Sequence, residues 1–299
     1  MTDTPATTPA SSIHVSVLLD EVVEWLAPRP GQVLVDGTLG GGGHTRQLSA
    51  RVGPGGLVLA LDRDPTALAR AERELAGQAV QLAHASFHEL PEVLPQIGVE
   101  RVDGIILDLG VSSDQLAAAD RGFSYLATGD LDLRFDPTSG EPAWRLLQRA
   151  TAEQLADWIY EYGEERFSRR IARKIVEARS SQPVRTAAEL AELVRSCVPR
   201  AKHHDIDPAT RTFQALRIAV NGELQVLDRA LQVLPDTLRP GGRLAVISFH
   251  SLEDRRVKEA FRTDCRLSTL TKKPIRPNES ELQRNPRSRS ARLRVAERV

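Results

Sequence analysis

The sequence contains little cysteine, few aromatic residues and no long hydrophobic run. Cys197 and Cys265 are the two cysteines among 299 residues, so we expect neither a disulfide framework nor a cysteine-based metal site. No segment approaches the roughly 18 consecutive apolar residues of a membrane-spanning helix, so we expect no membrane association. Residues 1–12 lack the basic start and apolar centre of a targeting signal. We predict that they form a disordered tail and that the protein is cytoplasmic.

The charges balance overall but are unevenly distributed. Forty lysines and arginines face forty acidic residues, which excludes a molecule that is basic as a whole. From Arg284 to Arg298, however, six arginines stand against Glu297 alone. A second basic cluster comprises Arg166, Arg169, Arg170, Arg173 and Lys174. Arginine matches the geometry of phosphate oxygens, so both clusters predict nucleic-acid contacts. For the second cluster, a solvated helix face is an equally good interpretation, since acidic residues are interspersed.

The most informative segment is the glycine-rich run that follows the apolar residues 33–35. Five of the seven residues from Gly37 to Gly43 are glycine. Each glycine costs roughly 0.5 to 1 kcal/mol relative to alanine through lost backbone entropy. A backbone that passes directly against a ligand gives a reason to tolerate several. We therefore interpret residues 36–44 as a nucleotide-cofactor loop.

Spacing narrows the class of cofactor. A P-loop needs Gly-Lys followed by Ser or Thr, whereas His44 follows the last glycine here. The dinucleotide pattern fits only in part, because counting from Gly40 places Thr45 where the last glycine should stand. The remaining class is S-adenosylmethionine, held by an acid at the end of the first strand and by close backbone around its methionine part. Asp36 and the glycines 40–43 suit that ligand.

A second acid follows the next apolar run. Residues 57–61 are continuously apolar, as in a parallel strand buried on both faces, and Asp62 ends the run. Asp62 lies 22 residues after Gly40, near the distance of about 20 at which an acid binds ribose hydroxyls. Asp64 precedes Pro65, which favours a helix N-cap at Asp64.

The order of apolar runs and helical segments predicts an α/β protein with a doubly wound, mainly parallel sheet. Strands are expected near 33–36, 57–61, 80–83 and 103–108. The next buried strand, 242–249, begins more than 130 residues after Asp108, far beyond a usual connection of about 2 to 6 residues. The intervening segments predict helices at 152–162, 164–179, 187–197 and 210–234, with capping patterns at Thr151–Gln154 and Thr186–Glu189. We predict a discontinuous catalytic domain, 13–118 and 219–299, interrupted by an all-helical insert, 119–218.

Ligands of open parallel sheets bind beyond the carboxyl ends of the strands, where Asp108 ends the fourth strand. At this place amino-group methyltransferases keep a residue that accepts hydrogen bonds from the target NH2. Their Asp-Pro-Pro-aromatic signature is absent here. The base-stacking surface must then come from elsewhere, and Phe123, Tyr125 and Phe249 are the candidates.

The histidines carry weaker signals. His44 is expected at a helix start beside the cofactor, whereas His250 is either a contact of the site or structural. Ser251 with Asp254 resembles a capping pair. The tandem His203–His204 lacks a third ligand at helix spacing, so we expect no metal.

Taken together, the motifs resemble one bacterial family, the MraW/RsmH methyltransferases of small-subunit ribosomal RNA. The motifs that carry the resemblance extend over nearly the whole chain: His14–Glu21, Asp36–His44, Asp62–Pro65, Asp108–Ser113, Tyr162–Phe167, Thr210–Ala215 and Ser248–Asp254. The resemblance implies a Rossmann-like, S-adenosylmethionine-dependent methyltransferase. It also implies methylation of N4 of a cytidine in 16S rRNA, in the decoding region near the P site, with the insert as an rRNA-recognition domain.

The resemblance also assigns residues. It implies cofactor contacts at matched positions: Gly42, Gly43, His44, Asp62, Phe87, Asp108 and Gln115. We expect Asp108 to be catalytic as well, and the partner to be 16S rRNA within the 30S subunit. The oligomeric state stays open, with a homodimer as one alternative. Two rival functions also stay open, a nicotinamide-dependent oxidoreductase and a non-catalytic rRNA-binding assembly factor that keeps the cofactor as a structural ligand.

Overall fold

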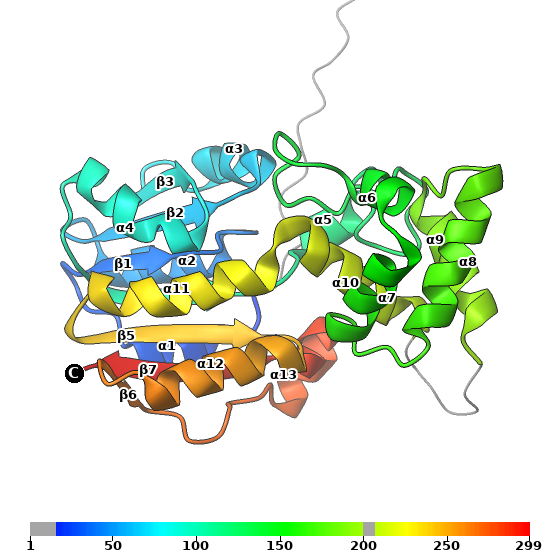
Figure 1. Ribbon diagram of the computed structural model, residues 1–299. Helices are drawn as coiled ribbons and strands as arrows, with labels where there is room; N and C mark the ends of the chain where they lie inside the picture. The colour runs from blue at the N-terminus through cyan, green and yellow to red at the C-terminus, as the bar shows by residue number, and fades with distance from the viewer. Residues whose placement is uncertain (1–15, 200–206) are drawn as a thin grey trace, which may run out of the picture.

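The computed structural model describes residues 16–199 and 207–299 (Figure 1). The predicted tail at residues 1–12 and the pair His203–His204 therefore lie outside the described residues. Within the described ranges, no helix is long and apolar enough to cross a membrane.

A seven-stranded sheet in the order β3-β2-β1-β4-β5-β7-β6 forms the centre of the molecule. The strands are β1 Val33–Asp36, β2 Leu57–Asp62, β3 Val80–His84, β4 Val102–Asp108, β5 Leu238–Ser248, β6 Leu267–Thr269 and β7 Arg292–Arg298. The first five run parallel, whereas β7 pairs antiparallel with β5 and β6. This confirms the predicted doubly wound, Rossmann-like α/β sheet. The strands β6 and β7 were not predicted.

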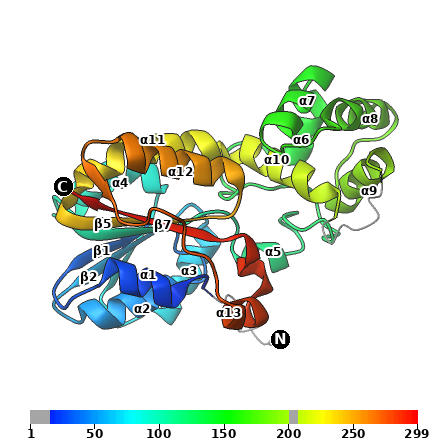
Figure 2. The same cartoon turned by 90° about the horizontal axis from the view of Figure 1, so that it is seen from below.

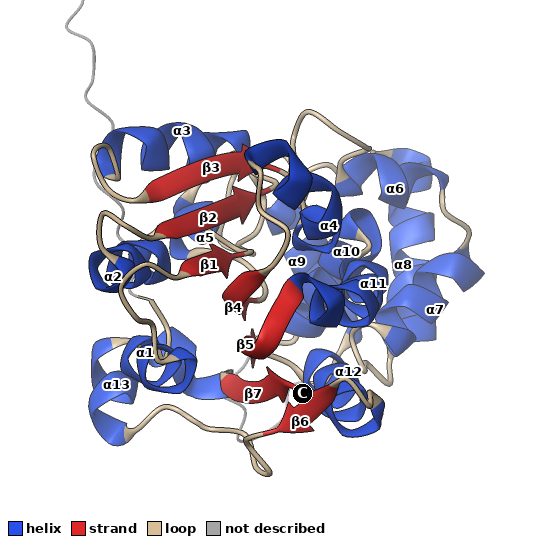
Figure 3. Cartoon of the chain, turned by 90° about the vertical axis from the view of Figure 1, so that its left-hand side faces the viewer, coloured by secondary structure: helices blue, strands red, loops and turns tan. Residues whose placement is uncertain are grey.

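Helices cover both faces of the sheet, because successive side chains of each strand point to opposite sides. In β1, for example, Leu34 belongs to the hydrophobic core on one face of the sheet, and Val35 belongs to the core on the opposite face. Helices α1 Leu19–Leu26, α2 Gly43–Val52 and α3 Pro65–Glu74 lie on the first face. Helices α4 Leu90–Val93, α11 Glu223–Thr237 and α12 Ser251–Thr263 lie on the other (Figure 3). Strands β1, β2 and β4 are thereby buried on both sides, whereas the edge strand β3 is partly exposed.

A group of helices stands beyond the carboxyl ends of the parallel strands (Figures 1 and 2). They are α6 Ala143–Arg149, α7 Ala152–Glu161, α8 Ser168–Ser181, α9 Ala187–Cys197 and α10 Ala209–Asn221. They share their own buried core, which includes Ile159, Ile171 and Leu190. Both predicted capping boxes, at Thr151 and Thr186, are present. These helices occupy the part of the chain where an insert was predicted, and the division into domains, with the insert at 119–218, stays a prediction. Residue 218 lies within α10.

Two helix boundaries differ from the predictions. The single helix predicted at 210–234 is two helices, because Gly222 adopts a left-handed backbone (φ 61°) and ends α10 before α11 begins. The helix predicted from residue 164 begins at Ser168, since Glu164 has φ 49° and cannot belong to a right-handed helix.

Five short helices complete the fold in the described ranges. They are η1 Phe87–Glu89, η2 Leu94–Ile97, α5 Ser113–Ala117 and α13 Glu279–Arg284, followed by η3 Pro286–Ser290. Three of these, η1, α5 and η3, bring residues to the cavity described next.

Candidate active site

A cavity of about 440 Å³ lies between the carboxyl ends of the strands and the helical unit. Its walls come from the loop after β1, from the ends of β2, β4 and β5, and from α10 and α11. The topology explains this position, because the ends of neighbouring parallel strands meet at one edge of the sheet. Of the predicted cofactor residues, six line the cavity: Gly43, His44, Asp62, Phe87, Asp108 and Gln115.

The glycine loop owes its composition partly to its own backbone and packing. Gly40 (φ 48°) and Gly42 (φ 75°) adopt left-handed conformations that other residues rarely reach. A Cβ on Gly43 would collide with the hydroxyl of Ser16. Gly42 does not line the cavity and forms the N-cap of α2 instead. The sequence analysis attributed these glycines to a backbone that passes close to a ligand. That reason alone does not explain every glycine of the loop.

Asp36 supports the loop from beneath. Its side chain is fully buried, and its oxygens accept hydrogen bonds from the Thr38 amide (3.1 Å) and the Thr45 hydroxyl (2.7 Å). Burial raises its pKa, although these hydrogen bonds oppose the change. Because Asp36 does not line the cavity, it shapes the loop and does not face a ligand.

Asp62 presents a rigidly held carboxylate to the cavity. Its Oδ2 accepts a hydrogen bond from the Gly40 amide and its Oδ1 one from the Asp64 amide, both at 2.8 Å. Burial raises its pKa to about 6 in spite of these two bonds. Asp64 caps α3 through the amide of Thr66 (3.0 Å), which confirms the predicted N-cap. As the sequence predicted, Asp62 faces the cavity, whereas Asp64 caps a helix.

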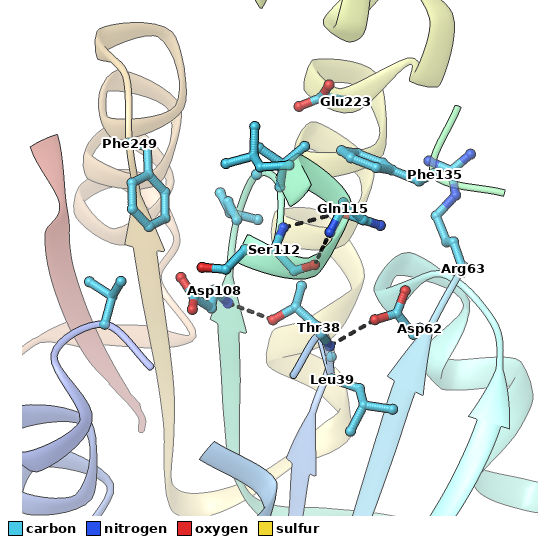
Figure 4. A pocket seen from close by; sticks show the side chains of 18 of the residues that line it. Thr38, Leu39, Asp62, Arg63, Asp108, Ser112, Gln115, Phe135, Glu223 and Phe249 are labelled. Atoms are coloured by element: carbon cyan, nitrogen blue, oxygen red, sulfur yellow. Dashed lines mark hydrogen bonds between the residues drawn. The ribbon is translucent and has the colours of Figure 1, made fainter. Parts of the chain in front are cut away.

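Gln115 and Phe87 close the side of the cavity next to Asp62. Gln115 donates from Nε2 to Asp64 Oδ2 (3.1 Å) and accepts through Oε1 from the Ser112 amide (3.1 Å), as Figure 4 shows in part. Its amide is therefore tied to the protein, so it positions α5 as well as lining the cavity. Phe87 adds an apolar wall from η1.

Asp108 lies at the end of β4 in the middle of the site (Figure 4). Its amide donates to the Thr38 hydroxyl (2.6 Å), which holds the strand end against the glycine loop. Its Oδ1 is buried and has no hydrogen-bond partner among the described residues. Burial, and then the charges of Asp36 and Glu253, raise its pKa well above the ordinary value. Oδ1 of Asp108 can therefore accept a hydrogen bond from a ligand.

His44 stands beside Asp108 as a neutral imidazole. Its Nε2 lies 3.1 Å from the carbonyl oxygen of Val17, which can only accept, so Nε2 carries the proton. Burial lowers its pKa to about 4. The free Nδ1 lies 3.8 Å from Asp108 Oδ2. His44 is therefore at the helix start beside the cavity, as predicted.

His250 is structural. It is the N-cap of α12, where its Nδ1 accepts from the Glu253 amide (3.4 Å) and its Nε2 lies 3.2 Å from Glu253 Oε1. The predicted capping pair of Ser251 with Asp254 is wrong, because Asp254 instead forms an ion pair with Arg294 (2.7 Å). Burial would raise the pKa of Glu253, but the hydrogen bond and charge of His250 lower it overall.

One of the three candidate stacking residues reaches the cavity. Phe249, directly after β5, lines it, whereas Phe123 and Tyr125 do not. Phe123 stacks on Phe135 with ring centroids 5.8 Å apart, and Tyr125 contacts Phe213 edge-on at 6.3 Å. Both belong to the core of the helical unit. Phe135 lines the cavity and was not predicted.

Two further cavity residues, Arg217 and Glu223, were also not predicted. Arg217 lies two residues beyond the Thr210–Ala215 motif, on the same helix α10. The motif was therefore a signal, but nothing in the sequence alone indicated that α10 turns this face toward the strand ends.

The arginine-rich C-terminal segment is largely built into the fold. Residues 292–298 form β7, in which Arg292 and Arg294 both pair with Asp254. Arg298 donates to the carbonyl oxygen of Arg266. The prediction of nucleic-acid contacts from the whole cluster is therefore too broad. Arg287, exposed in η3, lines the cavity and forms no ion pair with the residues that the structure describes.

The second basic cluster is an exposed face around the start of α8. Arg166, Arg169, Arg170 and Arg173 are exposed, and none forms an ion pair within residues 16–199 and 207–299. The interspersed acids are engaged elsewhere: Glu164 with Arg255, Glu165 with Arg211, and Glu177 with Lys174. These arginines therefore keep their charge unneutralised by the described residues, and both interpretations, nucleic-acid contact and a solvated helix face, stay open.

No group of three or more potential metal ligands occurs in the part of the chain that the structure describes. Asp207, close to the tandem histidines in the sequence, forms an ion pair with Arg195 (2.7 Å).

The sequence pattern of one protein family, the MraW methylase family, matches residues 11–299. The chain belongs to this family. It is 52% identical to a ribosomal RNA small subunit methyltransferase H of Rhodopirellula baltica, with 97% of this chain and 93% of the relative covered. It is 50% identical to the protein of that name from Synechococcus elongatus, with 97% and 96% covered.

Solved structures resemble this MraW-family chain more distantly. An rRNA methylase from Streptococcus thermophilus matches with a TM-score of 0.44 and 13% identity, covering 94% of this chain and 93% of that one. Membership of a methylase family argues against the alternative of a nicotinamide-dependent oxidoreductase, which the glycine spacing already disfavoured.

Proposed function

We propose that this protein transfers a methyl group from S-adenosylmethionine to N4 of a cytidine in 16S rRNA, in the decoding region near the P site. The observation that carries the proposal is the buried Oδ1 of Asp108, which has no hydrogen-bond partner among the described residues and lies in the same cavity as Asp62 and the glycine loop. An unsatisfied acceptor is costly unless a ligand supplies its donor, and an exocyclic NH2 is such a donor. The names of the relatives support an rRNA substrate.

The residues on the Asp62 side fit the cofactor. S-adenosylmethionine supplies an electrophilic methyl group on a positively charged sulfur. Asp62 keeps lone pairs beyond its two backbone hydrogen bonds and would accept from the ribose hydroxyls. The backbone of Gly40 and Gly43 would lie against the methionine part, and the ring of Phe87 would cover the adenine. Gly42 would not contact the cofactor itself; as the N-cap of α2, it would position the glycines that do.

Asp108 would act on the amine. The N4 lone pair of cytosine is delocalised into the ring, so the amine must be oriented and its developing positive charge stabilised. In the proposed arrangement, Asp108 Oδ1 accepts a hydrogen bond from the NH2 and stabilises the charge while the N–C bond forms. The proton then leaves N4 for water. Alignment of this kind contributes up to about 7 to 11 kcal/mol in favourable intramolecular reactions.

The target base must be extruded or already unpaired to enter a cavity at the strand ends. The exposed arginines of α8 lie on the helical unit that forms the far wall, and they suit contacts to rRNA phosphates. We therefore propose that the helical unit recognises rRNA within the 30S subunit, and that the protein acts in the cytoplasm.

Tritium transfer from labelled S-adenosylmethionine tests the function. Undermethylated 30S subunits and naked 16S rRNA serve as parallel substrates, and nucleoside analysis identifies the product. Label in N4-methylcytidine on 30S subunits alone supports both the reaction and an assembled substrate. Absence of label from both, despite S-adenosylhomocysteine binding, would favour the non-catalytic assembly factor.

A further inference from the structure

The cavity contains a second polar group that the proposed reaction does not use. Arg217 of α10 lines it on the side of the helical unit. We propose that Arg217 determines specificity for cytosine by donating from Nη1 to the ring acceptors N3 or O2, while Asp108 accepts from N4. This inference rests on the proposed function and extends it to recognition of the base.

The guanidinium of Arg217 is held rigidly and leaves one nitrogen free. Its Nε and Nη2 donate to the two carboxylate oxygens of Glu223, at 2.8 and 2.9 Å. Such a bidentate pair fixes the guanidinium plane. No protein group within the described ranges accepts a hydrogen bond from Nη1. Burial alone would lower the pKa of Arg217, but the charge and hydrogen bonds of Glu223, together with the charge of Glu253, raise it overall, so the group stays cationic.

The free nitrogen lies close to the loop that follows Asp108. A Cβ built on Gly110 would stand 4.0 Å from Arg217 Nη1 and 3.7 Å from Cδ2 of Phe249. Figure 4 shows Phe249 on the opposite side of Asp108 from Asp62, and Glu223 above the strand ends. The donor and the aromatic ring therefore both lie next to the loop that follows Asp108, and Phe249 is separated from Asp62 of the proposed ribose site by Asp108.

This set of groups complements the polar edge of cytosine. That edge presents the N4 donor next to two acceptors, N3 and O2, and it needs an acceptor followed by a donor from the protein. Asp108 and Arg217 supply them in that order, and Phe249 offers a surface for stacking. Uracil presents an acceptor at position 4 and a donor at N3, so the same pair would face it with mismatched groups.

The alternative is that Arg217 and Glu223 only tie α10 to α11. A double-mutant cycle between the residue and the base separates the two roles. Wild type and Arg217→Gln are assayed on 30S subunits whose target carries cytidine, 3-deazacytidine, which lacks the N3 acceptor, or 2-thiocytidine, which weakens the O2 acceptor. The readout is kcat/KM for tritium transfer.

We expect one analogue to lower the wild-type value by about 10- to 100-fold, as for loss of a charged hydrogen bond. Arg217→Gln should lower it similarly on cytidine, with little further loss on that analogue. Additive losses on both analogues would overturn the proposal, because a structural residue does not sense which ring atom is missing.

Controls keep the outcomes separate. Arg239→Gln removes an exposed arginine paired with Asp103 at the far end of β5, and it should behave as wild type. If Arg217→Gln fails to fold, Arg217→Lys enters the same cycle, since lysine keeps a charge without the fork. No transfer by wild type to unmodified cytidine would overturn the proposed function itself. Transfer with additive losses would overturn the role of Arg217 alone.

Discussion

Nδ1 of His44 and Oδ2 of Asp108 face each other at 3.8 Å, too far apart for a hydrogen bond. Nε2 of His44 donates its proton to the Val17 carbonyl oxygen, so Nδ1 is a hydrogen-bond acceptor. When Asp108 is ionised, this acceptor faces a second acceptor, the carboxylate oxygen. Together with the unpartnered Oδ1, this makes the carboxylate of Asp108 costly for the fold. Removing this carboxylate should therefore change stability and activity in opposite directions.

Asp108→Asn should stabilise the protein while abolishing its activity. The amide removes a buried charge, so the free energy of unfolding without cofactor at pH 7 should rise by about 1 to 3 kcal/mol. The single-turnover rate with saturating cofactor should fall by about 100-fold or more. Urea titration and rapid quench measure the two quantities. Asp157→Asn, on the exposed face of α7, is the matched control and should change neither. A near-wild-type rate would refute the catalytic role of Asp108.

His44→Gln should remove a pH dependence of stability. The folded pKa of His44 is about 4, below the unfolded value of about 6.5. The unfolded chain therefore binds more protons between pH 4 and 6.5, and the contribution of this residue to stability rises with pH across that window. The full change is about 3 to 4 kcal/mol, because each pH unit of that window contributes about 1.4 kcal/mol. Urea unfolding of both proteins from pH 4 to 7 measures the difference, and parallel curves would contradict the prediction.

Asp62→Asn should weaken cofactor binding. Asparagine loses one acceptor oxygen, so either the Gly40 or the Asp64 amide loses its partner and fewer lone pairs face the ribose. We expect a 10- to 100-fold higher dissociation constant for S-adenosylhomocysteine by calorimetry, from about 1.5 to 3 kcal/mol per charged hydrogen bond. In wild type, S-adenosylhomocysteine should raise the melting temperature and NAD should not. Stabilisation by NAD alone would restore the oxidoreductase alternative.

Charge reversal on α8 should weaken rRNA binding without affecting the cofactor. The double variant Arg169→Glu, Arg173→Glu removes two exposed positive charges that are unpaired among the described residues. Affinity for 30S subunits should fall, and the slope of log K against log salt should decrease by about 1 for each lost phosphate contact. Arg51→Glu, exposed on α2, provides the control. An unchanged slope would assign the cluster to a solvated helix face.

The positions of the loop, Asp62 and Asp108 could be predicted because each depends on local pattern. A parallel strand is a short apolar run, and the residue that ends it must emerge at the ligand-binding edge. Capping at Asp64, Thr151 and Thr186 is equally local, since cap and partner are two or three residues apart.

Contacts between distant segments could not be predicted in the same way. Whether an arginine is free or paired depends on what folds against it, and Arg294 is neutralised by Asp254, 40 residues earlier. The same holds for the break at Gly222, which brings Glu223 back onto Arg217.

The sequence by itself determined the chemistry available to this protein: a glycine loop, two strand-end carboxylates and a helical unit beyond them. Only the tertiary structure decided which groups are desolvated and which keep a free hydrogen-bonding atom. In this structure Asp108 Oδ1 and Arg217 Nη1 have no hydrogen-bond partners among the described residues, whereas His250 serves as a helix N-cap. The physical reason is that the burial of a side chain and its hydrogen-bond partners depend on how whole helices and strands pack together. Residue spacing in the sequence indicates only where each helix or strand begins and ends.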